Sequence, residues 1–270
     1  MLTVALNGLM GLLLALALGA SHAAGWGWAV VWGVLAFIAG QGGTGYLIQK
    51  RIKAEMAAVQ KILEDGQKRL QMKVQQWQMR PPGSMKQAQM EIERDQRVFV
   101  DRALEASKGL ERYNRWAPLM GRQIATLKIQ LYWMLKEFKK VDELMPRALI
   151  MDPMMAAMKM ARMYMNNEEG LDKLFKKHTA RLRYGQGTLL YALYSWILVQ
   201  KKDIDGAHKV LIEACEKMEN DTIKKNRDHL ANNRVGHFSN MGLGDEWYAL
   251  HLEQPKVKMQ RKSRFNDRPF

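Results

Sequence analysis

The sequence predicts an all-α protein with an N-terminal transmembrane helical hairpin, a long stalk helix and a short α-solenoid of antiparallel helix pairs. Three observations support this fold class. Residues 1–49 carry no charged side chain, the following apolar positions recur at helical spacing, and helical segments alternate with short polar turns between about 120 and 221. The expected division is 1–48 for two membrane helices, 49–84 for a basic stalk helix and Pro-rich hinge, 85–254 for a helical-repeat domain with a C-terminal cap, and 255–270 for a disordered basic tail.

Two apolar runs, at 1–20 and roughly 25–48, form the expected hairpin and are separated by "SHAAG". Each is long enough for a hydrocarbon core of about 30 Å, which needs about 20 helical residues. Lys50, Arg51 and Lys53 follow at once and are expected to contact the membrane surface. Because positive flanking residues stay on the cytoplasmic side, the soluble part is expected to be cytoplasmic.

A cleaved signal peptide is the alternative for residues 1–23, because "ALGASHAAG" offers small residues typical of a cleavage site. A signal peptide needs a positively charged start, and "MLTVALNG" has only its amino terminus. In either case the second apolar run remains as an anchor.

The segment "GQGGTG" at 40–45 matches the G-x-G-x-x-G pattern of a dinucleotide-binding loop. That pattern indicates nucleotide binding only between a strand and a helix, with a second, acidic strand about 20 residues later. Here the flanking segments have helical or membrane character. The glycines are better interpreted as a close-packing surface for the first helix, and this surface would comprise Gly33, Gly40, Gly42, Gly43 and Gly45.

The stalk carries one apolar stripe at helical spacing, which Gly66 interrupts. The stripe comprises Ile48, Ile52, Met56, Val59, Leu63, Leu70, Val74 and Trp77. Its near-heptad spacing permits self-association, but such a stripe more often packs on its own domain, and we favour that interpretation. "RPPGS" at 80–84 then predicts a hinge.

The chain of 270 residues is strongly basic, with 42 Lys and Arg against 27 Asp and Glu, a net charge of +15. All of this charge lies outside the first 49 residues. Anionic lipid headgroups and nucleic-acid phosphates both attract such a surface. The tail "PKVKMQRKSRFNDRPF" has three interpretations: a solvated segment, which we favour, contact with anionic lipid, or contact with RNA or the ribosome.

The segment "LYWMLKEFKKVDELMPRALIMDP" at 131–153 resembles a tetratricopeptide repeat, a 34-residue pair of antiparallel helices. With Pro153 closing the unit, the resemblance places Tyr132 on the aromatic position of the first helix and Phe138 near the turn. It places Ala148 on the small position of the second helix.

A second unit at 188–221 has Ser195, Ala207 and Ala214 at the small positions and "KKDIDGA" as its turn. Between the two units, "NNEEG" predicts the turn of a degenerate third pair. The resemblance covers roughly residues 120–221. It implies a solenoid that holds segments of other proteins in its groove.

The segment "HFSNMGLGDEWYALHLEQP" is expected to cap the last repeat. The alternative is a binding loop of His237, Phe238 and Trp247.

Candidate chemistry is sparse. Seven of the fifteen residues in "MDPMMAAMKMARMYM" (151–165) are Met, which we interpret as core, with an adaptable partner surface and a soft-metal site as weaker alternatives. The six histidines show no metal-ligand spacing, and the single cysteine, Cys215, excludes an intrachain disulfide. No catalytic motif is present, so we expect no enzyme, no cofactor and no metal.

Together these features predict an integral membrane scaffold or assembly factor that recruits an unidentified cytoplasmic protein to the lipid bilayer. The alternative is a membrane-tethered nucleic-acid or ribosome-binding module that uses the basic surface.

Overall fold

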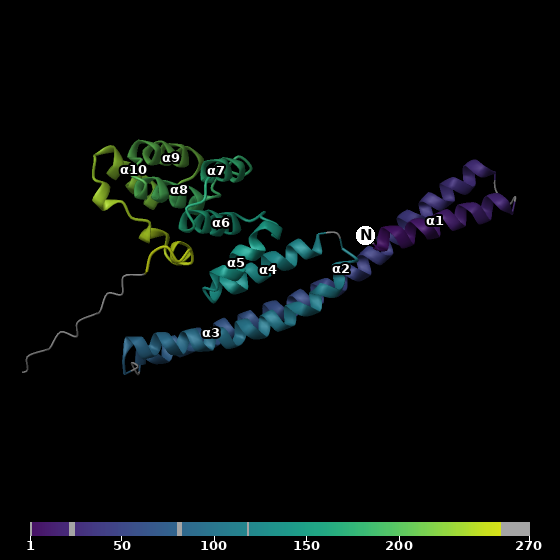
Figure 1. The fold of residues 1–270 in the computed structure, drawn as a ribbon, viewed down its shortest axis with the longest axis horizontal. Helices are drawn as coiled ribbons and strands as arrows, with labels where there is room; N and C mark the ends of the chain where they lie inside the picture. Colours follow the sequence, from purple (N-terminus) through teal and green to yellow (C-terminus); the bar gives the residue numbers. More distant parts are fainter. Residues whose placement is uncertain (1, 22–24, 80–82, 118, 255–270) are drawn as a thin grey trace, which may run out of the picture. The chain divides into compact units, whose positions relative to one another are not determined.

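The computed structural model describes residues 2–21, 25–79, 83–117 and 119–254, and every regular element in these ranges is a helix (Figure 1). The chain forms two compact units, Met1–Leu149 and Ile150–Phe270. The expected hinge prolines, Pro81 and Pro82, and the basic tail at 255–270 lie outside the described residues. The all-α prediction is confirmed.

Unit 1 contains the apolar hairpin and the helices that pack on its extension. In chain order its elements are α1 (Leu2–Ala20), α2 (Trp26–Met79), α3 (Met85–Lys108), the 3₁₀ helix η1 (Gly109–Tyr113), α4 (Met120–Met134), α5 (Phe138–Leu144) and the 3₁₀ helix η2 (Met145–Arg147). α1 lies along the first part of α2, and α3 runs back along its second part (Figure 1).

Helix α2 is continuous from the apolar run through the whole stalk. Its 54 residues correspond to about 81 Å of helix at 1.5 Å per residue. The GQGGTG segment lies inside this helix, so it forms no phosphate-binding loop between a strand and a helix. The second arm of the hairpin and the stalk are thus one helix.

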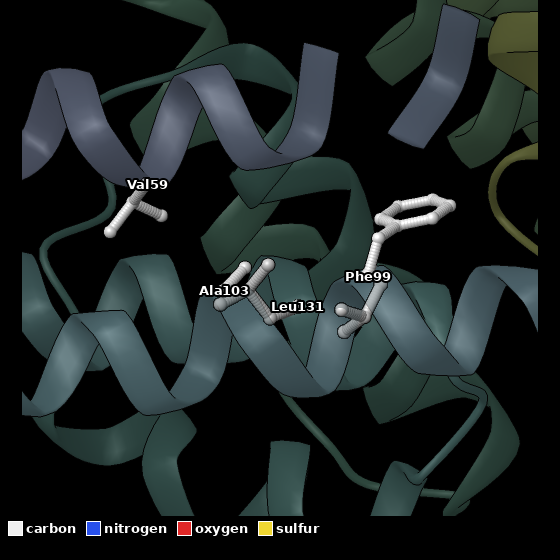
Figure 2. Packing of buried hydrophobic residues seen from close by; sticks show 5 residues of the cluster. Val59, Phe99, Ala103 and Leu131 are labelled. Carbon is white, nitrogen blue, oxygen red and sulfur yellow. The ribbon is translucent and has the colours of Figure 1, made fainter. Parts of the chain in front are cut away.

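The stalk stripe packs on its own chain, as favoured from the sequence. Val59 of α2 lies against Phe99 and Ala103 of α3 and Leu131 of α4 (Figure 2). Closer to the hairpin, Ile48, Ile52 and Met56 pack on a second cluster, which comprises Leu110, Tyr113, Met120 and Ile124. The expected 85–254 domain therefore has its first part, 85–149, grouped with α2, because the apolar face of α3 is matched to the stripe.

Gly66 was expected to interrupt the stripe. In the structure it is buried, and the Phe99 ring packs directly against it. A Cβ atom at Gly66 would overlap the Phe99 ring. Because only glycine leaves this space free, the aromatic ring of α3 reaches the backbone of α2.

Two ion pairs join α2 to α3 further along α2, beyond the contact between Gly66 and Phe99. Lys73 Nζ lies 2.7 Å from an Asp95 carboxylate oxygen and 3.0 Å from one of Glu91. Its hydrogen bonds to Asp95 and then Glu91 raise the pKa of Lys73 above its ordinary value.

Unit 2 contains the remaining helices, packed around α8. They are α6 (Pro153–Met165), α7 (Leu171–Thr179), α8 (Thr188–Gln200), α9 (Ile204–Lys217), α10 (Asp221–Ala231), the 3₁₀ helices η3 (Val235–His237) and η4 (Met241–Leu243), and α11 (Asp245–Tyr248). α8 contacts α6, α7 and α9, and nine consecutive residues from Leu189 to Ile197 are buried.

Four helices, α4, α6, α8 and α10, end in the same way. Each is followed by a non-glycine residue in the left-handed region two positions after the helix, namely Lys136, Asn167, Lys202 and Asn233. At each end, the amide of the next residue donates to a carbonyl five residues earlier, as in Glu137 to Tyr132 at 3.0 Å and Asp203 to Leu198 at 2.9 Å. These are Schellman endings. They recur 31, 35 and 31 residues apart.

Candidate functional site

The hairpin exposes its large apolar side chains and has two helices long and apolar enough to cross a membrane. Exposed residues include Leu9, Leu12, Leu13, Val30, Leu35 and Ile38. Aromatic side chains border this band on α2: Trp26, Trp28 and Trp32 near its start, and Tyr46 near its end, all more than half exposed. Trp28 and Tyr46 are separated by about 27 Å of helix, close to the thickness of a hydrocarbon core.

Small and polar residues form the contact between the two hairpin helices. Thr3, Asn7, Gly11 and Gly19 are the buried residues of α1, at spacings that are multiples of four. A Cβ at Gly33 would lie 2.7 Å from the Gly11 carbonyl oxygen, so the two backbones touch. The sequence interpretation did not identify this stripe, although its spacing of four residues is visible in α1.

The predicted glycine surface is correct at two of its five positions. Gly33 faces Gly11, and Gly40 faces the Asn7 side chain. A Cβ atom added at Gly42, Gly43 or Gly45 would meet no atom within 4 Å, so these three glycines do not contact α1. The physical reason is helical rotation: Gly33 and Gly40 are seven residues apart and share a face, whereas the other three lie off it.

The Asn7 side chain is the centre of a hydrogen-bond network at one end of the hairpin. Its Nδ2 donates to Gln41 Oε1 at 2.8 Å and to Thr44 Oγ1 at 2.9 Å. The Thr44 hydroxyl in turn donates to the Gly40 carbonyl at 2.7 Å. Asn7 is only 5% exposed, so its amide is satisfied where water is largely excluded.

The same end of the hairpin carries the predicted membrane-surface residues. Lys50, Arg51 and Lys53 are all exposed on α2. The start of α1 lies here too, since the Leu2 amide donates to the Arg115 carbonyl at 3.1 Å. Basic residues from two separate segments thus gather at this end.

A hollow of about 710 Å³ lies where α2 leaves the apolar band. Its walls are one face of α2, the last turn of η1 and the residue Trp116. The lining residues are Thr44, Leu47, Ile48, Arg51, Ala54, Glu55, Arg112, Tyr113 and Trp116. Arg112 pairs with Glu55 and lies over the Tyr113 ring, its guanidinium carbon 4.9 Å from the ring centroid.

The predicted repeat positions in unit 1 are only partly those that pack. Trp133, not Tyr132, is the buried aromatic of α4, and it meets the Phe138 ring edge-on at 5.4 Å. Tyr132 is half-buried under Lys140, whose Nζ lies 4.7 Å from the ring centroid. A shift of one residue rotates a helical side chain by about 100°, which pattern matching did not resolve.

Ala148 does not occupy a helical position. α5 ends at Leu144, and Ala148 has an extended backbone after η2. Pro146 explains the early end, because proline lacks the amide hydrogen and its ring would clash with the carbonyl four residues earlier. Pro153 likewise begins α6 rather than closing the preceding helix.

In unit 2 the small residues lie where two helices approach closely. Ser195 of α8 and Ala207 and Ala214 of α9 are fully buried. The Ser195 hydroxyl donates to the Ala192 carbonyl at 3.1 Å, so it needs no partner from another helix.

The methionine-rich segment contributes mainly to the core of unit 2. Helix α6 buries Met155, Met158 and Met160, whereas Met151, which precedes the helix, is 79% exposed. The interpretation of this segment as core therefore fits the buried methionines of α6.

A second hollow, of about 370 Å³, lies in unit 2 among α6, α7 and α8. Its lining includes the carboxylates of Glu168, Glu169 and Asp172, together with Tyr194 and Lys201. The Tyr194 hydroxyl donates to Asp172 at 3.2 Å, and burial, followed by the Asp172 charge, raises the pKa of Tyr194 to about 12. This phenol is therefore a neutral donor at physiological pH.

The C-terminal segment covers α8 with aromatic contacts. Trp247 is fully buried and meets the Trp196 ring edge-on at 5.7 Å. One Glu253 carboxylate accepts both indole N–H groups, at 2.9 Å from Trp196 and 2.8 Å from Trp247. Trp247 thus belongs to the core of unit 2 rather than to a binding loop with His237 and Phe238.

Comparisons of the chain with protein-family models, with curated proteins and with solved structures find no significant match. Within the described residues, no group of three His, Cys, Asp or Glu side chains is placed to hold a metal ion. The function must therefore be inferred from the hairpin, the helix pairs and the two hollows.

Proposed function

We propose that the chain is a membrane-anchored helical-repeat scaffold, or assembly factor, that recruits a cytoplasmic protein partner to the bilayer. The observation that carries the proposal is the recurring helix ending at Lys136, Asn167, Lys202 and Asn233. Its spacing of 31 to 35 residues lies around the 34-residue period of tetratricopeptide repeats. A repeated ending at a near-constant period is expected when one two-helix unit is used several times.

The anchor follows from the hairpin. Its apolar side chains are exposed while small and polar ones are buried, the arrangement favoured when lipid is the solvent. Because Lys50, Arg51 and Lys53 flank the band, we place unit 2 on the cytoplasmic side.

The partner is a protein segment, and the acidic hollow of unit 2 is where we expect it to bind. Lys201 can donate to its backbone carbonyls, the Tyr194 oxygen can accept from its amides, and Glu168 and Glu169 favour a basic side chain. Repeats of this kind are similar in use as well as shape, since they hold extended or helical segments of other proteins.

The test is site-specific photo-crosslinking of the full chain in native membranes. A photoreactive residue at position 201, on the rim of the hollow, should give one discrete protein adduct, while the same residue at exposed position 61 of α2 should not. The adduct should survive nuclease treatment and moderate salt.

A nuclease-sensitive adduct whose yield falls steeply with salt would instead support the alternative, a membrane-tethered nucleic-acid or ribosome-binding module. The net charge of +15 is the observation that favours that alternative. Equal adducts from positions 201 and 61 would contradict the scaffold.

A further inference from the structure

We propose that the hollow at the end of the hairpin binds one anionic glycerophospholipid, with its phosphate at Arg51 and Arg112 and an acyl chain along Leu47. This lipid site goes beyond recruitment of a protein partner, and it rests on the membrane-anchor part of the proposed function. Its starting observation is a hollow of about 710 Å³ whose lining combines apolar side chains with two arginines.

The position of the hollow matches the headgroup layer. Tyr46 ends the aromatic-bordered band on α2, and Leu47 and Ile48 follow as lining residues. Arg51 lies one turn further along the same face, about 5 Å beyond Leu47 and Ile48. A lipid phosphate occupies this depth, just outside the hydrocarbon core.

The charges favour an anion. Arg112 is held by Glu55 and by the Tyr113 ring, so its guanidinium is oriented before a ligand arrives. Arg51 has no carboxylate partner among the described residues and is free to pair with a ligand. Two arginines against one glutamate leave the lining with one net positive charge, and planar guanidinium groups suit the oxygens of a phosphate.

The apolar walls favour a lipid over free phosphate. Leu47 is 61% exposed and Trp116 38% exposed, and both line the hollow. An acyl chain would cover these surfaces, whereas inorganic phosphate or a headgroup without chains would leave them in contact with water.

Contacts from α1 hold the segment that forms one wall of the hollow. The Leu2 amide and the Thr3 hydroxyl of α1 donate to the carbonyls of Arg115 and Trp116, at 3.1 and 3.4 Å. These contacts fix the segment that carries Trp116 against the hairpin. The walls of the hollow are therefore held together before a lipid enters, which lowers the ordering cost of binding.

The experiment is native mass spectrometry of the full chain in mild detergent, titrated with dioleoyl phosphatidylglycerol or dioleoyl phosphatidylcholine. We expect one phosphatidylglycerol to bind before any phosphatidylcholine. Glycerol 3-phosphate, which has the phosphate without the chains, should not displace it.

Three variants make the test specific. Arg51→Gln should weaken phosphatidylglycerol binding roughly tenfold or more, because a charge-assisted pair is lost. Lys53→Gln removes the same charge from the same helix but outside the lining, and should change affinity less than about twofold. Ala54→Trp fills the hollow without changing charge and should abolish the one-to-one adduct. Arg51, Lys53 and Ala54 are all exposed, so the fold should persist in each variant.

Equal weakening by Arg51→Gln and Lys53→Gln would show only diffuse attraction to a basic surface and would overturn the site. Equal binding of the two lipids, or full binding by Ala54→Trp, would do the same. Alkaline carbonate extraction of membranes separates this failure from failure of the anchor. A chain released by carbonate contradicts the anchor, whereas a retained chain that binds no phosphatidylglycerol contradicts this site alone.

Discussion

Helices α1 and α8 are both apolar on nearly every side, yet they bury opposite kinds of residue. α1 buries Thr3, Asn7, Gly11 and Gly19 and exposes its leucines. α8 buries the continuous run from Leu189 to Ile197, which includes three aromatic side chains. Composition alone does not distinguish the two helices.

The difference matches the two solvents that we propose for these helices, lipid for α1 and water around the unit that contains α8. In water the driving force is removal of apolar surface, and α8 satisfies it by being surrounded by other helices. In lipid no such force acts between helices, so close backbone contact and interhelical hydrogen bonds decide the interface. α1 has both, through Gly11 against Gly33 and through Asn7.

The largest effect is expected from Trp247→Ala, which tests whether burial of apolar surface holds α8 in unit 2. Loss of a fully buried indole that also donates to Glu253 should destabilise unit 2 by about 3–5 kcal/mol. Hydrogen exchange of α8 peptides in the full chain should quicken accordingly, with α1 peptides unchanged. Tyr184→Ala, at a 74% exposed position of the same unit, is the control and should have little effect. Equal quickening in both variants would break the comparison.

An intermediate effect is expected from Gly33→Ala, which tests whether close backbone packing holds α1 against α2. The new Cβ would lie 2.7 Å from the Gly11 carbonyl and 2.8 Å from the Ala15 Cβ, so the helices must separate at a cost of about 1–3 kcal/mol. Gly42→Ala, in open space on the same helix, should be neutral or slightly stabilising.

Spin labels at exposed Leu12 and Leu35, in a Cys215→Ser background, would report the α1–α2 distance in liposomes. Gly33→Ala should broaden or lengthen the distance distribution, and Gly42→Ala should leave it narrow. An unchanged distribution in both variants would mean that close packing does not hold the hairpin.

The smallest effect is expected from Asn7→Leu, which sharpens the comparison by removing the polar part of the hairpin contact. Loss of the hydrogen bonds to Gln41 and Thr44 should cost about 0.6–2 kcal/mol. The same spin-label pair, measured against temperature, should show α1 separating at a lower temperature than in the unchanged chain. If Asn7→Leu instead raised the temperature at which α1 separates from α2, the Asn7 hydrogen bonds would not stabilise the hairpin.

Several elements were predictable because they depend on local pattern. The uncharged first 49 residues indicated two apolar helices, and the turns "NNEEG" and "KKDIDGA" correspond to the connections after α6 and α8. The site was less predictable. Arg51 was identified as a membrane-surface residue, but Arg112, Tyr113 and Trp116 were not, because they come from η1 and the residues after it, more than 50 positions along the chain.

The sequence by itself determined that the described residues form an all-α fold, that the first 49 residues carry no charge, and where charge accumulates, since these properties follow from composition and period. Only the tertiary structure decided that Trp133 rather than Tyr132 is buried, that Gly66 receives Phe99, and that Arg51 and Arg112 line one hollow. The physical reason is that these outcomes depend on helical rotation and on contacts between distant segments. A difference of one residue turns a side chain by about 100°, which a sequence pattern does not resolve.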